Sequence, residues 1–240
     1  MQKIAVLLCC CLLLTFVSLH AQEPGIRFGF QASPTISFFS TDDNLINNNG
    51  SNFPGLKLGL IGEKYFAENY AVTFGLGFAF NQGGRIAFED NRFVGAPYWP
   101  NSDLGVDVPD TIGVNNFNLR YNIQYVEIPL GLKLRTSELG YFRYYLEPHA
   151  VLGFRTNARG EVEGDGLSDI EKINIQEDVN PFAFSLGIGV GTEYSISSNT
   201  VLNGGIYYQR GIIDATKDVA NGDDAKASIN TITFRIAVML

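Results

Sequence analysis

The 240-residue sequence has little of several features that mark familiar protein classes. Charged residues make up only 18% of the chain, below the roughly 25% of a typical soluble domain. Basic residues are scarce: 17 Lys and Arg stand against 25 Asp and Glu, a net charge of −8. Because phosphate binding needs a basic surface, nucleic acid is excluded as an expected partner. After residue 21, no apolar run approaches the length of about 18 residues that is typical of a transmembrane helix.

Cysteine is absent beyond residue 11, since Cys9, Cys10 and Cys11 all lie in one apolar stretch near the N-terminus. Residues 1–21 carry Lys3 as their single charge, followed by an apolar run over 4–17 and a short segment before Gln22. This layout is typical of a secretory signal peptide. We therefore expect a signal peptide at residues 1–21 and one mature domain at 22–240. The mature domain then contains no cysteine, which excludes disulfides and cysteine catalysis from it.

Two alternatives for this N-terminal segment are weaker. The apolar run over 4–17 is shorter than the roughly 20 residues that a membrane-spanning anchor needs. A lipid-attachment cysteine would need small residues before it, whereas Leu7 and Leu8 precede Cys9.

The mature region does contain strict alternation of apolar residues with small or polar ones, the period of a β-strand with two different faces. Six runs show this pattern, at 26–38, 56–66, 72–80, 142–154, 182–190 and 232–240. A shorter run at 202–208 is less regular, and in the run at 121–134 the apolar residues change from odd to even positions at Tyr125 and Val126. A one-residue bulge there would move every later side chain to the other face. The sequence thus predicts eight strands.

The connections between these strands alternate in length. Those after the second, fourth and sixth strands are short, at 67–70, 136–140 and 197–200. Those after the first, third, fifth and seventh strands are long, at 39–53, 82–118, 156–180 and 211–227. This predicts an all-β fold, an eight-stranded antiparallel up-and-down barrel with every long loop at one end and both termini at the other.

The direction of the apolar face separates a transmembrane β-barrel from a soluble lipocalin-like barrel. The interior of an eight-stranded barrel is only just wide enough to be filled by side chains, and the many Phe and Leu residues here would not fit. The opposite face is rich in Gly, Ala, Ser and Thr, which suits a crowded lumen. The long loops hold 18 of the 25 acidic residues, which suits water. We expect a transmembrane barrel and keep the soluble barrel as the alternative.

Most charged residues within the predicted strands fall on the small-residue face. Facing lipid, each would cost about 2–4 kcal/mol near the bilayer midplane, whereas in a lumen opposite charges can pair. We predict a polar lumen network that includes Arg143, Glu147, His149, Lys133, Glu127 and Arg155.

Short motifs spread over the mature region carry a family likeness. They are Phe-Gly-Phe at 28–30, Tyr-Val-Glu-Ile-Pro-Leu at 125–130, Gly-Leu-Lys-Leu at 131–134, Glu-Pro at 147–148 and the glycine-rich strand at 187–191. With the signal peptide, they resemble the PorT-type outer-membrane β-barrel proteins of the Bacteroidetes. The segment at 97–100 departs from that pattern. The resemblance implies an integral outer-membrane protein of a Gram-negative bacterium with extracellular long loops, and a role accessory to protein secretion or surface assembly.

An enzyme is the least favoured function. His149 is the one residue of the mature region suited to act as a base at neutral pH. A lipid deacylase needs a serine oriented by a histidine, and no serine lies near His149 on its own strand face. The adjacent strand offers Ser185 as the alternative. We expect His149 to be structural, and we expect no catalytic residue and no cofactor.

The loop at 156–180 is strongly acidic but lacks the fixed ligand positions of an EF-hand. We interpret it as a solvated loop without a metal, and keep calcium bridging to lipopolysaccharide or a partner as the alternative. Its acidic residues are Glu161, Glu163, Asp165, Asp169, Glu171, Glu177 and Asp178.

In the loop at 82–118, the aromatic residues Phe93, Tyr98 and Trp99, with Phe117, would form an exposed patch if they served a partner. We favour the alternative, in which the loop aromatics pack over the barrel mouth, and keep the partner patch as the second interpretation. The sequence favours a structural or interaction barrel, then a barrel that binds a surface ligand through its loops, then a narrow passive pore. The expected partners are outer-membrane lipid, lipopolysaccharide and other outer-membrane or secretion proteins.

Overall fold

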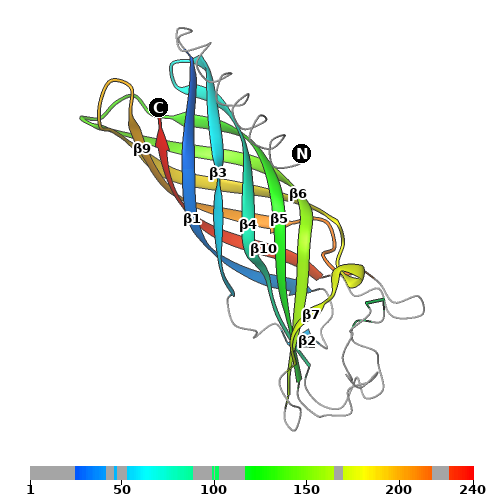
Figure 1. Ribbon diagram of the computed structural model, residues 1–240. Coiled ribbons are helices and arrows are strands. Elements are labelled where there is room, and N and C mark those ends of the chain that lie inside the picture. The colour runs from blue at the N-terminus through cyan, green and yellow to red at the C-terminus, as the bar shows by residue number, and fades with distance from the viewer. Residues whose placement is uncertain are drawn as a thin grey trace, which may run out of the picture.

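The computed structural model describes residues 25–41, 46–47, 53–88, 99, 101–102, 117–164, 170–217 and 227–240. These residues form a closed antiparallel β-barrel (Figure 1). The eight barrel strands among them are β1 (Ile26–Thr41), β3 (Phe53–Ala67), β4 (Tyr70–Phe88), β5 (Phe117–Arg135), β6 (Phe142–Gly164), β8 (Phe182–Ser195), β9 (Val201–Gly211) and β10 (Ala227–Met239). Two short strands, β2 (Ile46–Asn47) and β7 (Ile170–Asn174), pair with β4 and β6, and a 3-10 helix, η1, spans Gln176–Asp178. The predicted eight-stranded fold is confirmed.

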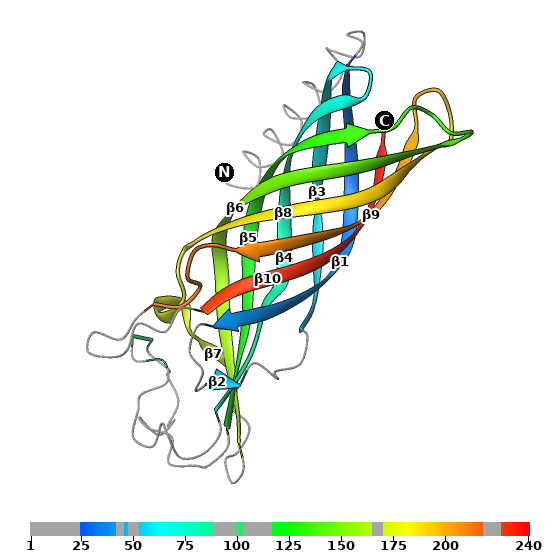
Figure 2. The ribbon, with the colours of Figure 1, turned by 180° about the vertical axis from the view of Figure 1, so that it is seen from behind.

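The ring closes between β1 and β10, with sequence neighbours paired all the way round (Figure 2). The short connections lie at the end where the chain leaves β10, and the Phe28 and Leu240 backbones are hydrogen-bonded there. The long connections lie at the opposite end, as the alternation of lengths predicted. The predicted signal peptide lies outside the described residues. No helix in the described part of the chain is long and apolar enough to cross a membrane.

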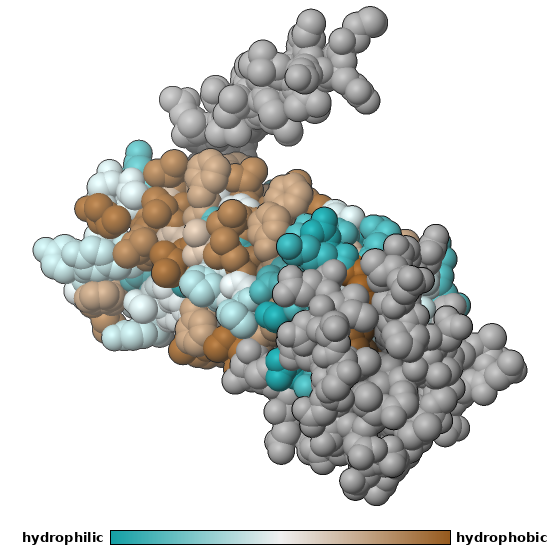
Figure 3. Space-filling view, turned by 60° about the horizontal axis from the view of Figure 1, so that its bottom comes forward, coloured by the Kyte–Doolittle hydropathy of each residue, from teal (hydrophilic) through white to brown (hydrophobic). Residues whose placement is uncertain are grey.

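The apolar face of the strands points outward. Phe30 of β1 is 65% exposed and Leu60 of β3 is 51% exposed. Ser33, Thr35 and Ser37, which alternate with apolar residues along β1, are buried. Figure 3 shows the apolar side chains as a belt over the barrel. A lipocalin-like barrel would have these side chains inside, so the structure excludes that alternative.

The bulge predicted in β5 is wrong. Tyr121, Ile123 and Tyr125 are buried on the same inner face as Lys133, so β5 keeps one register throughout. The extra residues belong instead to its two neighbours, between Ala79 and Gln82 of β4 and next to Arg155 of β6. The interior is polar between Tyr125 and the short turns, and it is apolar between Tyr125 and the loop end. The apolar residues of β5 change from odd to even positions at the boundary between these two environments.

Three strands extend beyond the barrel at the loop end. Residues 83–88 of β4 pair with β5, and residues 157–164 of β6 pair with the same stretch of β5. Figure 2 shows this three-stranded extension projecting past the ends of β8, β9 and β10. The predicted loops at 82–118 and 156–180 are thus partly strand, because the register shifts in β4 and β6 break the alternation that would have revealed them.

A substitution in β8 tests whether the inner face of the barrel has room only for small residues. A Cβ on Gly189 would collide with the ring of Tyr207, which is fully buried and held by Glu147. We expect Gly189→Val to lower the free energy of unfolding by about 1–3 kcal/mol, as overpacking does. Gly204 has nothing within 4 Å of such a Cβ, so Gly204→Ala is the matched control. Denaturant titrations followed by heat-modifiable gel migration measure both, and equal stability of the two variants would contradict the packed lumen.

Candidate functional site in the barrel lumen

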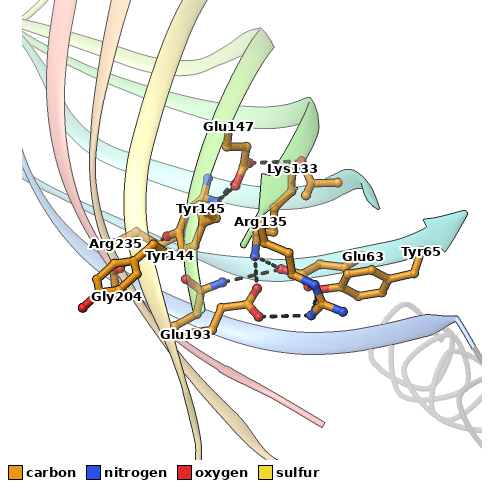
Figure 4. A network of polar contacts seen from close by, with 12 residues as sticks. Glu63, Tyr65, Lys133, Arg135, Tyr144, Tyr145, Glu147, Glu193, Gly204 and Arg235 are labelled. Atoms are coloured by element: carbon orange, nitrogen blue, oxygen red, sulfur yellow. Dashed lines mark hydrogen bonds and ion pairs between the residues drawn. The ribbon is translucent and has the colours of Figure 1, made fainter. Parts of the chain in front are cut away.

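The lumen nearest the short turns holds a cluster of paired charges. The Lys133 ammonium, which is fully buried, contacts Glu63 and lies 2.9 Å from Oε1 of Glu193. Arg135 Nη1 lies 3.2 Å from the other Glu193 oxygen and donates to the Tyr65 hydroxyl at 3.0 Å. Figure 4 shows these side chains converging from β3, β5 and β8. One ammonium thus joins two carboxylates on strands that are not adjacent.

A second cluster is centred on Glu147, which is 2% exposed. Its two carboxylate oxygens both accept from Arg235 Nη1 at 3.1 Å. The Tyr207 hydroxyl donates to Oε2 at 2.7 Å, and Thr73 Oγ1 donates to Oε1 at 3.0 Å. The Arg235 guanidinium also lies 3.7 Å from the centre of the Tyr207 ring. Strands β4, β6, β9 and β10 are thereby connected through one carboxylate.

A third contact lies closer to the loop end. Lys57 Nζ is 2.9 Å from Glu127 Oε2 and donates to Gln209 Oε1 at 2.7 Å. The three clusters satisfy charges that would be costly if left alone in a dry interior. They also connect strands that share no backbone hydrogen bonds, such as β3 with β5 and β6 with β10.

An apolar cluster fills the loop end of the interior. Trp99 is 4% exposed and packs edge-to-face on Tyr121, with ring centres 5.8 Å apart, and Phe39 packs on the same tyrosine at 5.2 Å. The neighbouring Asn101 is tied to the end of η1, since its backbone N and its Nδ2 both donate to Asp178 Oδ1 at 2.9 Å. The lumen is therefore filled with polar groups at one end and with aromatic groups at the other.

The residues predicted for the lumen network fall into two groups. Glu127, Lys133 and Glu147 lie in the paired clusters described above. His149 is buried beside them, with Nδ1 3.1 Å from the Glu147 backbone oxygen and its ring packed edge-on against Tyr207. Sequence parity places all four side chains inside the barrel.

Arg143 and Arg155 lie apart from these clusters. Arg143 pairs with Glu138 in the short connection before β6. Arg155 donates to the backbone oxygens of Gln176 and Val179, which holds η1 against the barrel mouth. The alternation along a strand shows whether a side chain faces the lumen or the lipid. The position of the residue along the barrel axis decides which partner its side chain contacts.

Sequence reasoning left Glu63, Glu193 and Arg235 out of the predicted network, and it did not identify the role of Tyr207. All four occupy inward positions of their strands, so their parity was a usable signal. Their ion-pair partners lie 58 to 88 residues away in the chain, and Glu147, to which Tyr207 donates, lies 60 residues away. Only the barrel register brings these residues together.

The partner-patch interpretation is wrong for Trp99, which is buried among Tyr121, Ile123 and Ile175. A Cβ on Gly160 would collide with its ring, so the glycine makes room for it. Phe93 and Tyr98 lie outside the described residues. Trp99 follows the favoured interpretation, in which the loop aromatics pack over the barrel mouth.

In the described ranges, His149 and Ser185 do not form the hydrogen-bonded pair that a serine hydrolase needs. His149 Nε2 has no hydrogen-bond partner there, and Ser185 lies two register positions along β8 from the residue opposite His149. Within the same ranges, no group of three His, Cys, Asp or Glu side chains is placed to hold a metal ion. Of the acidic loop residues, Glu161 pairs with Arg120 at 2.8 Å and Asp178 binds Asn101. The side chains of Glu163, Asp165, Asp169 and Glu171 lie outside the description.

The central ammonium offers a direct test of the lumen clusters. Lys133→Met would leave Glu63 buried without its cation, and removing one partner of a buried pair costs about 3–5 kcal/mol. We expect a loss of that size in the free energy of unfolding, measured by denaturant titration in detergent micelles. Lys64→Met is the control, because the exposed Lys64 neighbours Glu63 on the opposite face of β3. If both variants keep wild-type stability, the clusters do not contribute as described.

Comparisons with known proteins identify one protein family and several similar solved structures. Residues 20–217 match the sequence model of the outer membrane protein beta-barrel domain family. No curated protein matches the sequence. Similar solved structures include OprG of Pseudomonas aeruginosa (10% identity, 90% of this chain and 95% of that chain covered, TM-score 0.47). A major outer membrane protein of Thermus thermophilus (14%, 90% and 99%, 0.45) and neisserial surface protein A (13%, 89% and 96%, 0.44) are also similar.

The family match covers most of the sequence, and the barrel with its outward apolar belt has the construction that such a domain requires. The chain belongs to the outer membrane protein beta-barrel domain family and is an integral protein of the outer membrane.

Proposed function

We propose that this protein is a non-catalytic, non-conducting scaffold of the outer membrane that presents its loop end to other components of the cell surface. The observation that carries this proposal is the filled lumen. Lys133 is fully buried, and Glu147 and Glu193 are each 2% exposed, inside the part of the lumen nearest the short turns. A passive pore needs water at these positions, so the geometry favours a barrel that serves as an anchor.

The part of the molecule available for interaction is the extension of β4, β5 and β6. It continues beyond the lipid-facing belt and carries the connections at 89–116 and 165–169, which are rich in acidic residues. The resemblance to the PorT-type proteins of the Bacteroidetes supports an accessory role in protein secretion or surface assembly. In this proposal residues 1–21 direct export, residues 22–240 form the mature barrel, and the long loops are extracellular.

Lipopolysaccharide is the lipid partner that we propose. Arg85 and Arg120 lie directly opposite each other in adjacent strands, and Arg159 occupies the next outward position on β6. Arg120 is paired with Glu161 at 2.8 Å, and the exposed Arg159 lies on the same outward face of the extension. These basic side chains support the proposal because the phosphates of lipopolysaccharide are anionic. This proposal also accommodates the second candidate function, the binding of a surface ligand through the loops.

Conductance distinguishes the scaffold from a pore. We expect the wild-type protein in planar bilayers to show no stable ion current, because the clusters around Lys133 and Glu147 fill the lumen. The double variant Tyr145→Ala and Tyr207→Ala removes two rings from that layer and is expected to increase the leak. The control is Tyr144→Ala with Tyr208→Ala, which removes two lipid-facing rings. Steady channel openings in the wild type would contradict the proposal.

The interaction role predicts recovery of surface-assembly or secretion components with the protein. We expect chemical cross-linking in cells, followed by purification from detergent-solubilised membranes, to yield such components. A variant with Glu163→Gln, Asp165→Asn, Asp169→Asn and Glu171→Gln, which neutralises the acidic connection, is expected to recover less. Equal recovery by the variant would remove this connection from the interface, and recovery of lipid alone would leave the protein as a stand-alone barrel.

A further inference from the structure

A small cavity lies in the barrel wall between the Lys57–Glu127 pair and the apolar cluster. Its volume is about 50 Å³, enough for a few water-sized groups. Gln82, Glu127 and Gln209 line its inner side, and Phe182, Phe184 and Ile213 line its outer side. Phe182 is 56% exposed on the lipid-facing surface and packs edge-to-face on Phe154. The cavity therefore has a polar inner end and an apolar rim that faces the membrane.

The rim lies at a gap in the backbone ladder. Ile212 N donates to Phe184 O at 2.9 Å, and the following bond across this seam joins Asn180 N to Ala215 O at 2.8 Å. Between these two bonds, the Phe182 backbone N–H is satisfied by the Asn180 side chain at 3.1 Å rather than by the opposite segment. Among the described residues, no backbone hydrogen bond joins the two segments between these positions, and Phe182, Phe184 and Ile213 line the cavity there. We call this place, between β8 and the chain that follows β9, the lateral window.

The inner end of the cavity contains an unused hydrogen-bond acceptor. Gln82 is 2% exposed, and its Nε2 donates to the Phe80 backbone oxygen at 2.9 Å and to Thr35 Oγ1 at 3.1 Å. Because a backbone oxygen can only accept, the orientation of the amide is fixed, and Oε1 has no partner among the described residues. A buried acceptor without a donor is unfavourable, so the site is built to receive a donor.

We propose that the cavity binds the hydroxyl end of a medium-chain aliphatic alcohol or hydroxylated lipid chain, which enters through the lateral window from the outer leaflet. The hydroxyl donates to Gln82 Oε1, and the chain lies between Phe182 and Ile213 toward lipid. A carboxylate would be repelled by Glu127 and cannot donate to Gln82. An ammonium would place a second cation beside Lys57, which already neutralises Glu127 at 2.9 Å. The volume limits the inserted part to the hydroxyl and a few carbon atoms.

The test is a titration of the purified protein in lipid nanodiscs with 1-decanol, n-decane and decanoic acid. The methyl NMR signals of Ala183 and Ala215, two alanines that line the cavity, report on occupancy. We expect saturable shifts with 1-decanol and none with the other two. Gln82→Leu removes the acceptor at similar volume and is expected to weaken 1-decanol binding about tenfold, the effect of losing one buried hydrogen bond.

Two further variants keep the result interpretable. Ser185→Leu fills the cavity from β8 and is expected to abolish the shifts. Gln31→Leu makes the same chemical change in the lumen on β1, away from the cavity, and is expected to bind as the wild type does. Heat-modifiable migration verifies that each variant is folded. Equal shifts with n-decane, unchanged binding by a folded Gln82→Leu variant, or no saturable shift at all would overturn the proposal, the last by showing that the cavity holds only water.

Discussion

The closure of eight strands into a ring is the constraint on which the rest of this structure depends. In lipid no backbone N–H or C=O can be left unpaired, so the sheet must have no free edge, and β1 therefore pairs with β10. Eight strands enclose an interior only as wide as a few side chains. Every inward residue must then be small or must find a partner across the lumen. Gly189 beside Tyr207, and Lys133 between Glu63 and Glu193, are two outcomes of this single limit.

The interior is divided along its length into two kinds of environment. On the short-turn side of Tyr125, the inward positions carry charges in pairs that join non-adjacent strands of the ring. On the loop side, the inward positions of β5 carry apolar side chains, which pack with Trp99 and with the segment that follows β7. The register shifts in β4 and β6 lie at the boundary between the two environments. There the three longest strands leave the ring and form the extension. The gap in the backbone ladder beside Phe182 lies on the other side of β8 from β6.

Much of the fold follows from the sequence because its two strongest signals are local. Alternation with a period of two gives the strands and their faces, and the lengths of the connections give the order of the strands and the positions of the termini. The error in β5 has a physical cause. The apolar parity of a membrane strand reports the lipid-facing side only where the lumen is polar, and at Tyr121 and Ile123 the inner side is apolar as well.

The sequence by itself determined that this chain forms an eight-stranded barrel with an apolar exterior, because each strand carries its own pattern of faces. It also determined that charges such as Glu147 point inward. Only the tertiary structure decided that Glu147 meets Arg235 and Tyr207, that Arg143 stays at the rim, and that Gln82 keeps an unused acceptor. The physical reason is that a contact across the lumen depends on the height of each residue in its strand. That height is set by register shifts and by barrel closure, and no local pattern records either of them.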